Sequence, residues 1–192
     1  MSNLLEVRWH GRGGQGAKTA ALLFAEAALA TGKYVQAFPE YGPERMGAPV
    51  QSFNRLSDEP ITLHCHIASP EIVVVLDPTL IGKVDVTGGL PEDGSIIINT
   101  PLKPDEMREK LGLKKGKVFT VDASKIAKEC IGLEIPNTPM MGALVRVIKI
   151  LDLEQVLTDA KKKLEKKFMH KPEVISGNIE SIKRAYMEAN GE

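Results

Sequence analysis

The sequence predicts an α/β fold in which helices cover both faces of a mostly parallel or mixed sheet, followed by a helical C-terminal region. Apolar, strand-like runs alternate with helical stretches over the first three quarters of the 192 residues. Residues 72–76 form a continuous, mostly β-branched run, which is typical of a strand buried on both faces. Because domains commonly have roughly 100–200 residues, we expect residues 1–192 to form one domain.

Six strands are expected, each an apolar run bounded by Gly, Pro or Asp. They cover residues 4–9, 34–38, 50–55, 72–76, 95–99 and 118–121. Pro39 is expected to end the second strand, because proline has no N–H to donate to a sheet. Residues 39–49 contain too many prolines and glycines for regular structure, so we expect a long, specific loop there.

Six helices are expected between and after these strands. They cover residues 17–31, 104–111, 123–131, 139–151, a lysine-rich stretch from 153 onward, and 172–189. Gly32 follows the first helix, Asp122 and Thr138 can cap the third and fourth, and proline opens the second and fourth. The lysine-rich helix carries an apolar stripe at helical spacing and ends at Lys171-Pro172.

The composition excludes several classes of protein. Hydrophobic residues make up 43% of the chain and charged residues 26%, and 25 basic residues balance 25 acidic ones, so no general attraction to nucleic acid or anionic membranes is expected. Cys65 and Cys130 form no C-x-x-C pair, so we expect no iron–sulfur or zinc site built by this chain alone. Glu6 and Arg8 interrupt the first apolar run, and no segment is long enough to span a bilayer, which predicts a soluble, cytoplasmic protein.

The most informative motif is Gly11-Arg12-Gly13-Gly14-Gln15-Gly16, which lies between the first expected strand and the first expected helix. A glycine loop in this place presents backbone N–H groups and the positive end of the helix dipole to an anion. Its spacing also fits G-x-G-x-x-G, whose dinucleotide-binding form needs an acidic residue about 20 residues further on, and Glu40 is the nearest candidate. Three interpretations remain open: a tight turn without ligand, a phosphate or cofactor contact, and a complete NAD or FAD site.

The proline- and glycine-rich loop is predicted to be a protein interface, because it combines rigid backbone with apolar bulk and an arginine. The residues assigned to it are Phe38, Tyr41, Gly42, Pro43, Glu44, Arg45 and Met46. His64-Cys65-His66 could place two histidines on one face of a strand, but no third ligand lies nearby in the sequence, so no metal site is expected. No catalytic residue is assigned, since the chain shows no readable nucleophile–base arrangement.

Three stretches together resemble the gamma subunit of the 2-oxoacid:ferredoxin oxidoreductases of the pyruvate type (pyruvate synthase). They are Arg12-Gly13-Gly14-Gln15-Gly16, then Pro39-Glu40-Tyr41-Gly42-Pro43-Glu44-Arg45-Met46-Gly47-Ala48-Pro49-Val50, and Pro136-Asn137-Thr138-Pro139-Met140-Met141-Gly142-Ala143. Relatives that act on 2-oxoglutarate tend to have Arg-Gly-Gly in the second stretch, so Met46 and Ala48 favour the pyruvate type.

The resemblance implies a heterotetrameric complex that converts pyruvate and coenzyme A to acetyl-CoA and CO2 with reduction of ferredoxin. It implies alpha, beta and delta partner subunits, thiamine diphosphate with Mg²⁺ between alpha and beta, and iron–sulfur clusters on delta. This chain would bind no cofactor alone and would not carry the carbon chemistry. Residues 11–16, opened by Gly11 and Arg12, would either contact the phosphates of coenzyme A or dock another subunit.

Three alternatives remain at this point. The chain could be the gamma subunit for another 2-oxoacid, such as 2-oxoisovalerate, indolepyruvate or 2-oxoglutarate. It could be a free-standing dinucleotide-binding oxidoreductase, or a pure interaction subunit without a ligand.

Overall fold

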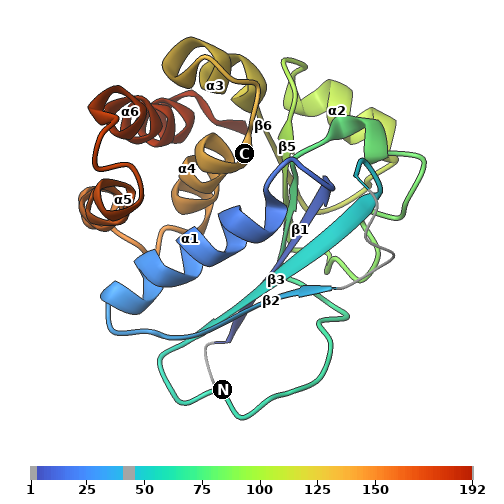
Figure 1. Ribbon diagram of the computed structural model, residues 1–192. Helices are drawn as coiled ribbons and strands as arrows, with labels where there is room; N and C mark the ends of the chain where they lie inside the picture. Colours follow the sequence, from blue (N-terminus) through green and yellow to red (C-terminus); the bar gives the residue numbers. More distant parts are fainter. Residues whose placement is uncertain (1–3, 41–45, 192) are drawn as a thin grey trace.

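A seven-stranded mixed sheet forms the centre of the computed structural model, which describes residues 4–40 and 46–191 (Figure 1). The strand order is β2-β3-β1-β4-β5-β6-β7. The neighbouring strands β1, β4, β5 and β6 run parallel, while β3, β2 and β7 run antiparallel to their partners. The strands are β1 (Leu5–Arg12), β2 (Tyr34–Glu40), β3 (Pro49–Ser57), β4 (Ile72–Val75), β5 (Ser95–Asn99), β6 (Lys117–Val121) and β7 (Asn190–Gly191).

Helices cover both faces of the sheet, which confirms the predicted fold class. Figure 1 shows α1, α3, α4, α5 and α6 on one face and α2 on the other. The helices are α1 (Ala17–Ala30), α2 (Pro104–Leu111), α3 (Ala123–Ile131), α4 (Asn137–Ile148), α5 (Leu153–Lys167) and α6 (Pro172–Glu188), and a short 3-10 helix, η1 (Pro78–Leu80), follows β4.

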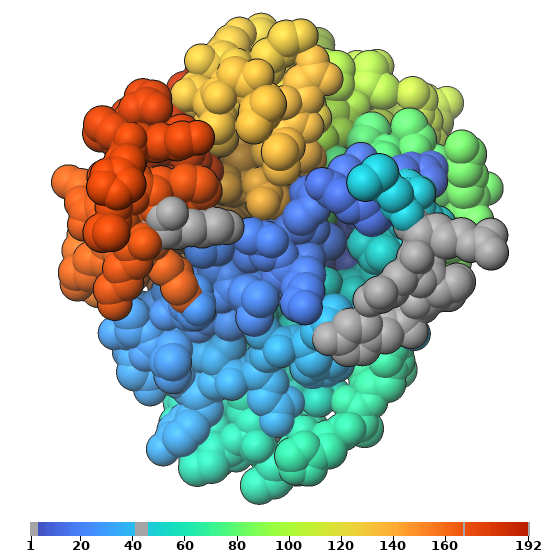
Figure 2. Space-filling model, viewed as in Figure 1, coloured from blue at the N-terminus to red at the C-terminus, as the bar shows by residue number. Residues whose placement is uncertain are grey.

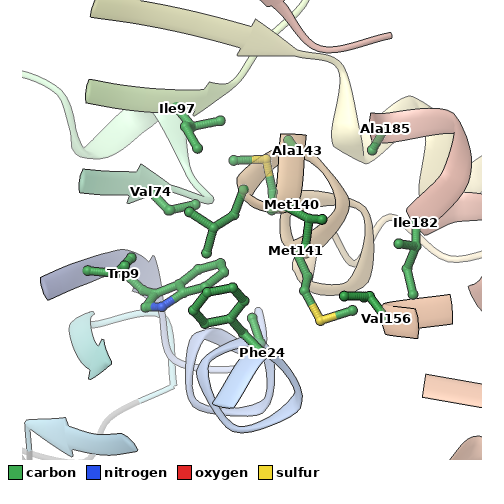
Figure 3. Close-up of a cluster of buried hydrophobic side chains, with 14 of the residues drawn as sticks. Trp9, Phe24, Val74, Ile97, Met140, Met141, Ala143, Val156, Ile182 and Ala185 are labelled. Carbon is green, nitrogen blue, oxygen red and sulfur yellow. The ribbon is translucent and has the colours of Figure 1, made fainter. Parts of the chain in front are cut away.

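Two apolar cores explain why the predicted central strands lack alternation. Val74 of β4 faces the core under α1 and α4, while its neighbours Val73 and Val75 face a second core under α2. Alternate residues of a strand point to opposite faces, so a strand between two cores must be apolar throughout. In the larger core, shown in Figure 3, the rings of Trp9 and Phe24 meet edge to face with centroids 6.3 Å apart.

The predicted end of the first strand is wrong. β1 continues through Gly11 to Arg12 instead of stopping near residue 9, because these residues pair with Val50 and Pro49 of β3. The first two residues of the glycine motif therefore belong to the sheet, and the connection to α1 is only Gly13 to Gly16.

The predicted end of the second strand is also wrong. β2 passes through Pro39 and ends at Glu40, and Pro39 lies opposite Ser52 of β3. β2 is at the edge of the sheet, where only one neighbouring strand needs hydrogen bonds, so a missing N–H is tolerated.

The fourth helix differs from the prediction at both ends. It begins at Asn137, so Thr138 lies inside the first turn, is buried and does not cap the helix. It ends at Ile148 rather than residue 151, because Lys149 adopts a left-handed conformation with φ 54°. The predicted cap of the third helix is confirmed, since Asp122 accepts a hydrogen bond from the N–H of Lys125 (3.1 Å).

Close packing of α4 on α6 fixes the C-terminal helices against the sheet. A Cβ atom placed on Gly142 would lie 2.2 Å from the carbonyl oxygen of Ile182, so the two helix backbones approach where glycine offers no side chain. Figure 3 shows Ile182 and Ala185 on α6 facing the residues of α4.

Gly142→Ala is expected to lower the free energy of unfolding by about 1–3 kcal/mol, because the added methyl group forces α4 and α6 apart. Intrinsic helix propensity alone predicts the opposite sign, by roughly 1 kcal/mol in favour of alanine. Urea denaturation measures the change, and Lys183→Ala on the exposed face of α6 is the control, expected to stay within about 0.5 kcal/mol of the wild type. A Gly142→Ala protein as stable as the wild type would contradict this packing.

Candidate functional site

The candidate site lies at the carboxyl ends of the parallel strands β1 and β4. β1 leads into α1 on one face of the sheet, whereas β4 leads into η1, whose Leu80 packs in the core on the other face. Where neighbouring parallel strands send their connections to opposite faces, a crevice opens between them, and α/β proteins bind ligands there. The glycine motif and the segment Asp77–Thr79 lie on the two sides of this crevice.

The N-terminus of α1 has the features of an anion-binding site. Its N-cap, Gly16, adopts a left-handed conformation (φ 80°). Among the described residues, no side chain caps this helix end, and its first turn contains no acidic residue. Gly16 also packs against α4, because a Cβ there would lie 2.6 Å from Nδ2 of Asn137. Gly14 is exposed, with φ 99°. This helix end therefore directs backbone N–H groups and the positive end of its dipole toward the edge of the crevice.

The side chain of Arg12 joins the two sides of the crevice. Its Nε atom pairs with Oδ2 of Asp77 at 3.0 Å, and its Nη2 atom donates to the hydroxyl of Thr79 at 2.9 Å. Its Nη1 atom donates to the carbonyl oxygen of Gly47 at 3.0 Å. The guanidinium thus joins the end of β1 to two other segments of the chain, and we call this set of contacts the Arg12 clamp.

The same clamp brings together two of the motifs singled out in the sequence. The N–H of Gly13 donates to the carbonyl of Ala48 (2.9 Å), and the N–H of Gly47 donates to the carbonyl of Gly13 (3.1 Å). Figure 2 shows the blue connection into α1 lying against the cyan start of β3. The β1–α1 loop and the residues that precede β3 therefore form one surface.

Gln15 holds the acidic member of the clamp in place. Its Oε1 atom accepts from the backbone N–H of Arg12 (2.8 Å), and its Nε2 atom donates to Oδ2 of Asp77 (2.8 Å). Burial alone would raise the pKa of Asp77, but hydrogen bonds from Thr79 and Gln15 and the charge of Arg12 outweigh it and lower the pKa below its ordinary value. The Asp77 carboxylate is thus ionised and fully engaged at neutral pH.

Asp77, which the sequence did not identify as a site residue, caps η1 by accepting from the N–H of Thr79 at 2.9 Å. Its pairing with Arg12 was missed. The available signal was an Asp directly after a buried strand, because the carboxyl ends of parallel strands meet at one edge of a sheet.

The interface prediction concerns seven residues, of which Tyr41, Gly42, Pro43, Glu44 and Arg45 lie outside the described residues. Met46 is 96% exposed beside the clamp. Phe38 lies in β2, and its partly buried ring stacks on Phe53 with centroids 5.4 Å apart. The prediction that this region contacts a partner stays a prediction.

Glu40 does not occupy the position that a dinucleotide site requires. It ends β2, and β3 lies between β2 and β1, so two strand spacings, roughly 10 Å, separate it from the strand that carries the glycine motif. In the dinucleotide fold the acidic residue ends the strand next to the first one. The arrangement therefore favours a phosphate contact or a docking role over a complete NAD or FAD site.

A buried Arg8–His10 pair lies on β1 just before the motif. The Nε atom of Arg8 donates to Nε2 of His10 at 2.9 Å, and its Nη2 atom donates to the carbonyl oxygens of Gly88 (2.6 Å) and Val86 (3.2 Å). His10 is 1% exposed, and burial together with the nearby charge of Arg8 lowers its pKa to about 4. His10 is thus a neutral hydrogen-bond acceptor that fixes the end of β1.

The segment His64-Cys65-His66 forms no strand, so its histidines do not share a strand face. The ring of His66 packs against Phe53, with centroids 4.9 Å apart. Within residues 4–40 and 46–191, no group of three or more His, Cys, Asp or Glu side chains is arranged to hold a metal ion.

The sequence model of the family described as pyruvate ferredoxin/flavodoxin oxidoreductase matches residues 6–188. The chain belongs to this family. It is 49% identical to pyruvate synthase subunit PorC of Thermotoga maritima over 183 residues, covering 95% of this chain and 93% of that protein. It is 51% identical over 158 residues to the pyruvate/ketoisovalerate oxidoreductases common subunit gamma of Pyrococcus abyssi, covering 82% and 85%.

The fold agrees with that of a solved family member. The crystal structure of pyruvate oxidoreductase subunit PORC from Thermotoga maritima matches with a TM-score of 0.86 and 46% identity, covering 98% of both chains. Among the helices of the described ranges, none combines the length and apolar character needed to span a membrane.

His10 is expected to make the stability of the protein depend on pH. The folded chain protonates it only near pH 4, whereas the unfolded chain does so near 6.5, so as the pH falls through this window the unfolded state is favoured by up to about 3 kcal/mol. His10→Gln keeps an acceptor for Arg8 and removes the titration. The free energy of unfolding, measured by denaturant titration at several pH values, should therefore fall more steeply with acidity in the wild type. Parallel pH profiles would contradict the neutral, buried state of His10.

Gln15→Glu is expected to loosen the clamp, because it places a second carboxylate against Asp77, 2.8 Å from its Oδ2 atom. We expect a loss of about 2 kcal/mol in the free energy of unfolding. A double-mutant cycle with Asp77→Asn should return a coupling energy above about 1 kcal/mol.

Gln155→Glu is the matched control for this experiment. Gln155 donates to Asp159 at the same kind of distance, 2.9 Å, but on the exposed face of α5. Its substitution should change stability by less than about 0.5 kcal/mol. Equal effects at the two glutamines would show that Gln15 has no special role at the crevice.

Proposed function

We propose that the chain is the gamma subunit of a multisubunit pyruvate:ferredoxin oxidoreductase. One observation carries this proposal: the match to pyruvate synthase subunit PorC covers 95% of this chain and 93% of that protein at 49% identity. The shared region therefore spans nearly the whole chain. The complex would convert pyruvate and coenzyme A to acetyl-CoA and CO2 and pass two electrons to ferredoxin.

Within such a complex the chain acts as a scaffold. Thiamine diphosphate, Mg²⁺ and iron–sulfur clusters belong to the alpha, beta and delta partners in this proposal. The described residues support it through the Arg12 clamp, which turns three chain segments into one rigid surface at the edge of the sheet. Such a surface suits the positioning of a ligand or a neighbouring subunit.

The 2-oxoacid specificity is assigned to the partners of this chain. The Pyrococcus abyssi relative is named as a gamma subunit common to pyruvate and ketoisovalerate oxidoreductases. One gamma chain that serves two oxidoreductases cannot by itself choose between their substrates. Pyruvate is proposed as the substrate here because the PorC relatives are named for it, with 2-oxoisovalerate as the alternative.

The ligand proposed for the glycine loop is coenzyme A, bound through its phosphates. Arg12 is assigned mainly a positioning role, because Asp77, Thr79 and Gly47 already accept a hydrogen bond from each of its three guanidinium nitrogens. The contact is therefore assigned to the backbone N–H groups around Gly14 and Gly16 and to the dipole of α1. Arg12 and Gln15 hold that backbone in position.

Docking of another subunit is the second candidate role for this loop. Met46 supports it, because its side chain is 96% exposed one residue away from the clamp. Large exposed apolar side chains beside rigid backbone are typical of interface anchors.

Thr19→Glu distinguishes the two roles in the reconstituted complex. Thr19 is exposed in the first turn of α1, three residues after the N-cap, so a glutamate there can fold back onto the backbone N–H groups of the helix start. It should keep or raise the stability of the helix while repelling a phosphate. We expect the KM for coenzyme A to rise about tenfold, with the subunits still co-eluting.

Ala30→Glu adds the same charge at the exposed far end of α1 and is the matched control, expected to leave the KM for coenzyme A unchanged. An unchanged KM for Thr19→Glu in an intact complex would rule out the phosphate contact. Loss of co-eluting subunits, with normal coenzyme A kinetics in the complex that remains, would assign the loop to docking.

A further inference from the structure

The chain has no net charge, but one of its corners is strongly basic. Residues 161–171 contain six lysines against one glutamate, which gives a formal charge of +5 with histidine neutral. Since the whole chain has 25 basic and 25 acidic residues, all the other residues together have a formal charge of −5. The positive charge is therefore concentrated at the end of α5 and in the turn that leads to α6. We call residues 161–171 the basic corner.

The basic corner lies at the surface beside α1. The apolar side of α5, with Val156, Leu157 and Ala160, packs into the larger core, so its lysines lie on the outer side of the helix. Residues of α1 and α5 together line a shallow groove, and Lys163 pairs across it with Glu26 of α1. Figure 2 shows the orange C-terminal helices at the surface next to the blue α1.

Acidic side chains of this chain balance the lysines of the corner poorly. Lys162 and Lys166 are four residues apart on α5, a spacing at which like charges destabilise a helix by roughly 0.2–0.5 kcal/mol. Lys162 has only a long contact with Asp159, at 3.5 Å. Among the described residues, no carboxylate forms an ion pair with Lys161, Lys166 or Lys171. The helix dipole favours cations only in the last turn, so it does not account for Lys161 and Lys162.

An exposed apolar side chain lies among these charges. Met169 is 73% exposed. Together with Ile175 of α6 it lines a groove of about 530 Å³, whose other walls are Lys162, Glu165 and Lys166. A partner that fits this surface is acidic and offers an apolar side chain to the groove.

The composition of the basic corner favours a partner that binds and leaves over a permanent subunit. Lysine and glutamate are depleted at the centres of protein interfaces, and obligate interfaces bury large apolar areas. Electron carriers instead form small, transient contacts, and complementary charge raises the rate at which such partners meet. A surface rich in lysine, with one exposed methionine, has the character of the transient kind.

We propose that the basic corner docks a small acidic electron-carrier protein, the ferredoxin that receives electrons from the complex. This inference rests on the proposed function, since it takes ferredoxin as the electron acceptor. The lysines attract the carrier and hold it against the complex, while an iron–sulfur cluster of a partner subunit donates the electrons to the cluster of the carrier. The chain described here supplies the surface and no redox group.

The test compares two electron acceptors in the reconstituted complex: a purified acidic [4Fe–4S] ferredoxin, and methyl viologen, a small dication that lysines repel. Lys162→Glu combined with Lys166→Glu should lower kcat/KM for ferredoxin about tenfold, because it reverses two charges of the docking surface. Turnover with methyl viologen should stay unchanged. The difference from the wild type should shrink at high salt, because the Debye length falls from about 10 Å at 0.1 M to about 3 Å at 1 M.

Lys114→Glu combined with Lys125→Glu is the matched control. It makes the same change in net charge at two exposed lysines outside the basic corner. It should leave kcat/KM for ferredoxin nearly unchanged, because charges more than a Debye length away are largely screened.

The outcomes separate this inference from the proposed function. Normal ferredoxin kinetics in an intact complex with Lys162→Glu and Lys166→Glu would overturn the inference, and so would an equal loss in the control, which reports net charge alone. Loss of co-eluting subunits would show that the basic corner is a permanent interface, which also overturns it. An unmodified complex that oxidises pyruvate with methyl viologen but does not reduce ferredoxin would instead contradict the proposed function.

Discussion

The ion pair between Arg12 and Asp77 is the interaction on which the edge of this fold depends. β1 and β4 are neighbours, yet their connections leave toward opposite faces, so nothing in the backbone ladder holds those connections together beyond the strand ends. The guanidinium closes this gap and also reaches Gly47, while Gln15 fixes the carboxylate. The glycine loop, η1 and the residues before β3 consequently behave as one unit.

Because side chains hold this loop and backbone groups face the crevice, a motif with the spacing of a dinucleotide site can serve another purpose. The side chains of Arg12 and Gln15 hold the loop, and the donors proposed for a ligand are backbone N–H groups at the start of α1. The strand on one side of β1 is the antiparallel β3, and the acidic residue that follows the parallel neighbour β4, Asp77, is already engaged by Arg12, Gln15 and Thr79. The result is an edge that can contact a phosphate without selecting a ribose.

The sequence predicted the parts of the fold that depend on local pattern. The apolar run at 72–76 predicts a buried strand, the alanine-rich stretch predicts a helix, and Asp122 predicts a helix cap. The structure contains all three. Features set by distant neighbours were missed: Pro39 is tolerated because β2 is an edge strand, and β7 is only two residues long. For the site, the pattern identified the loop and its backbone donors, but the partner of Arg12 lies 65 residues away and follows from the strand order.

A structure of the assembled complex with coenzyme A bound tests the central claim most directly. Our account predicts phosphate oxygens of coenzyme A within hydrogen-bond distance of the backbone N–H groups between Gly14 and the first turn of α1, with the Arg12–Asp77 pair intact. Coenzyme A located away from this chain, with the glycine loop contacting only a neighbouring subunit, would contradict it.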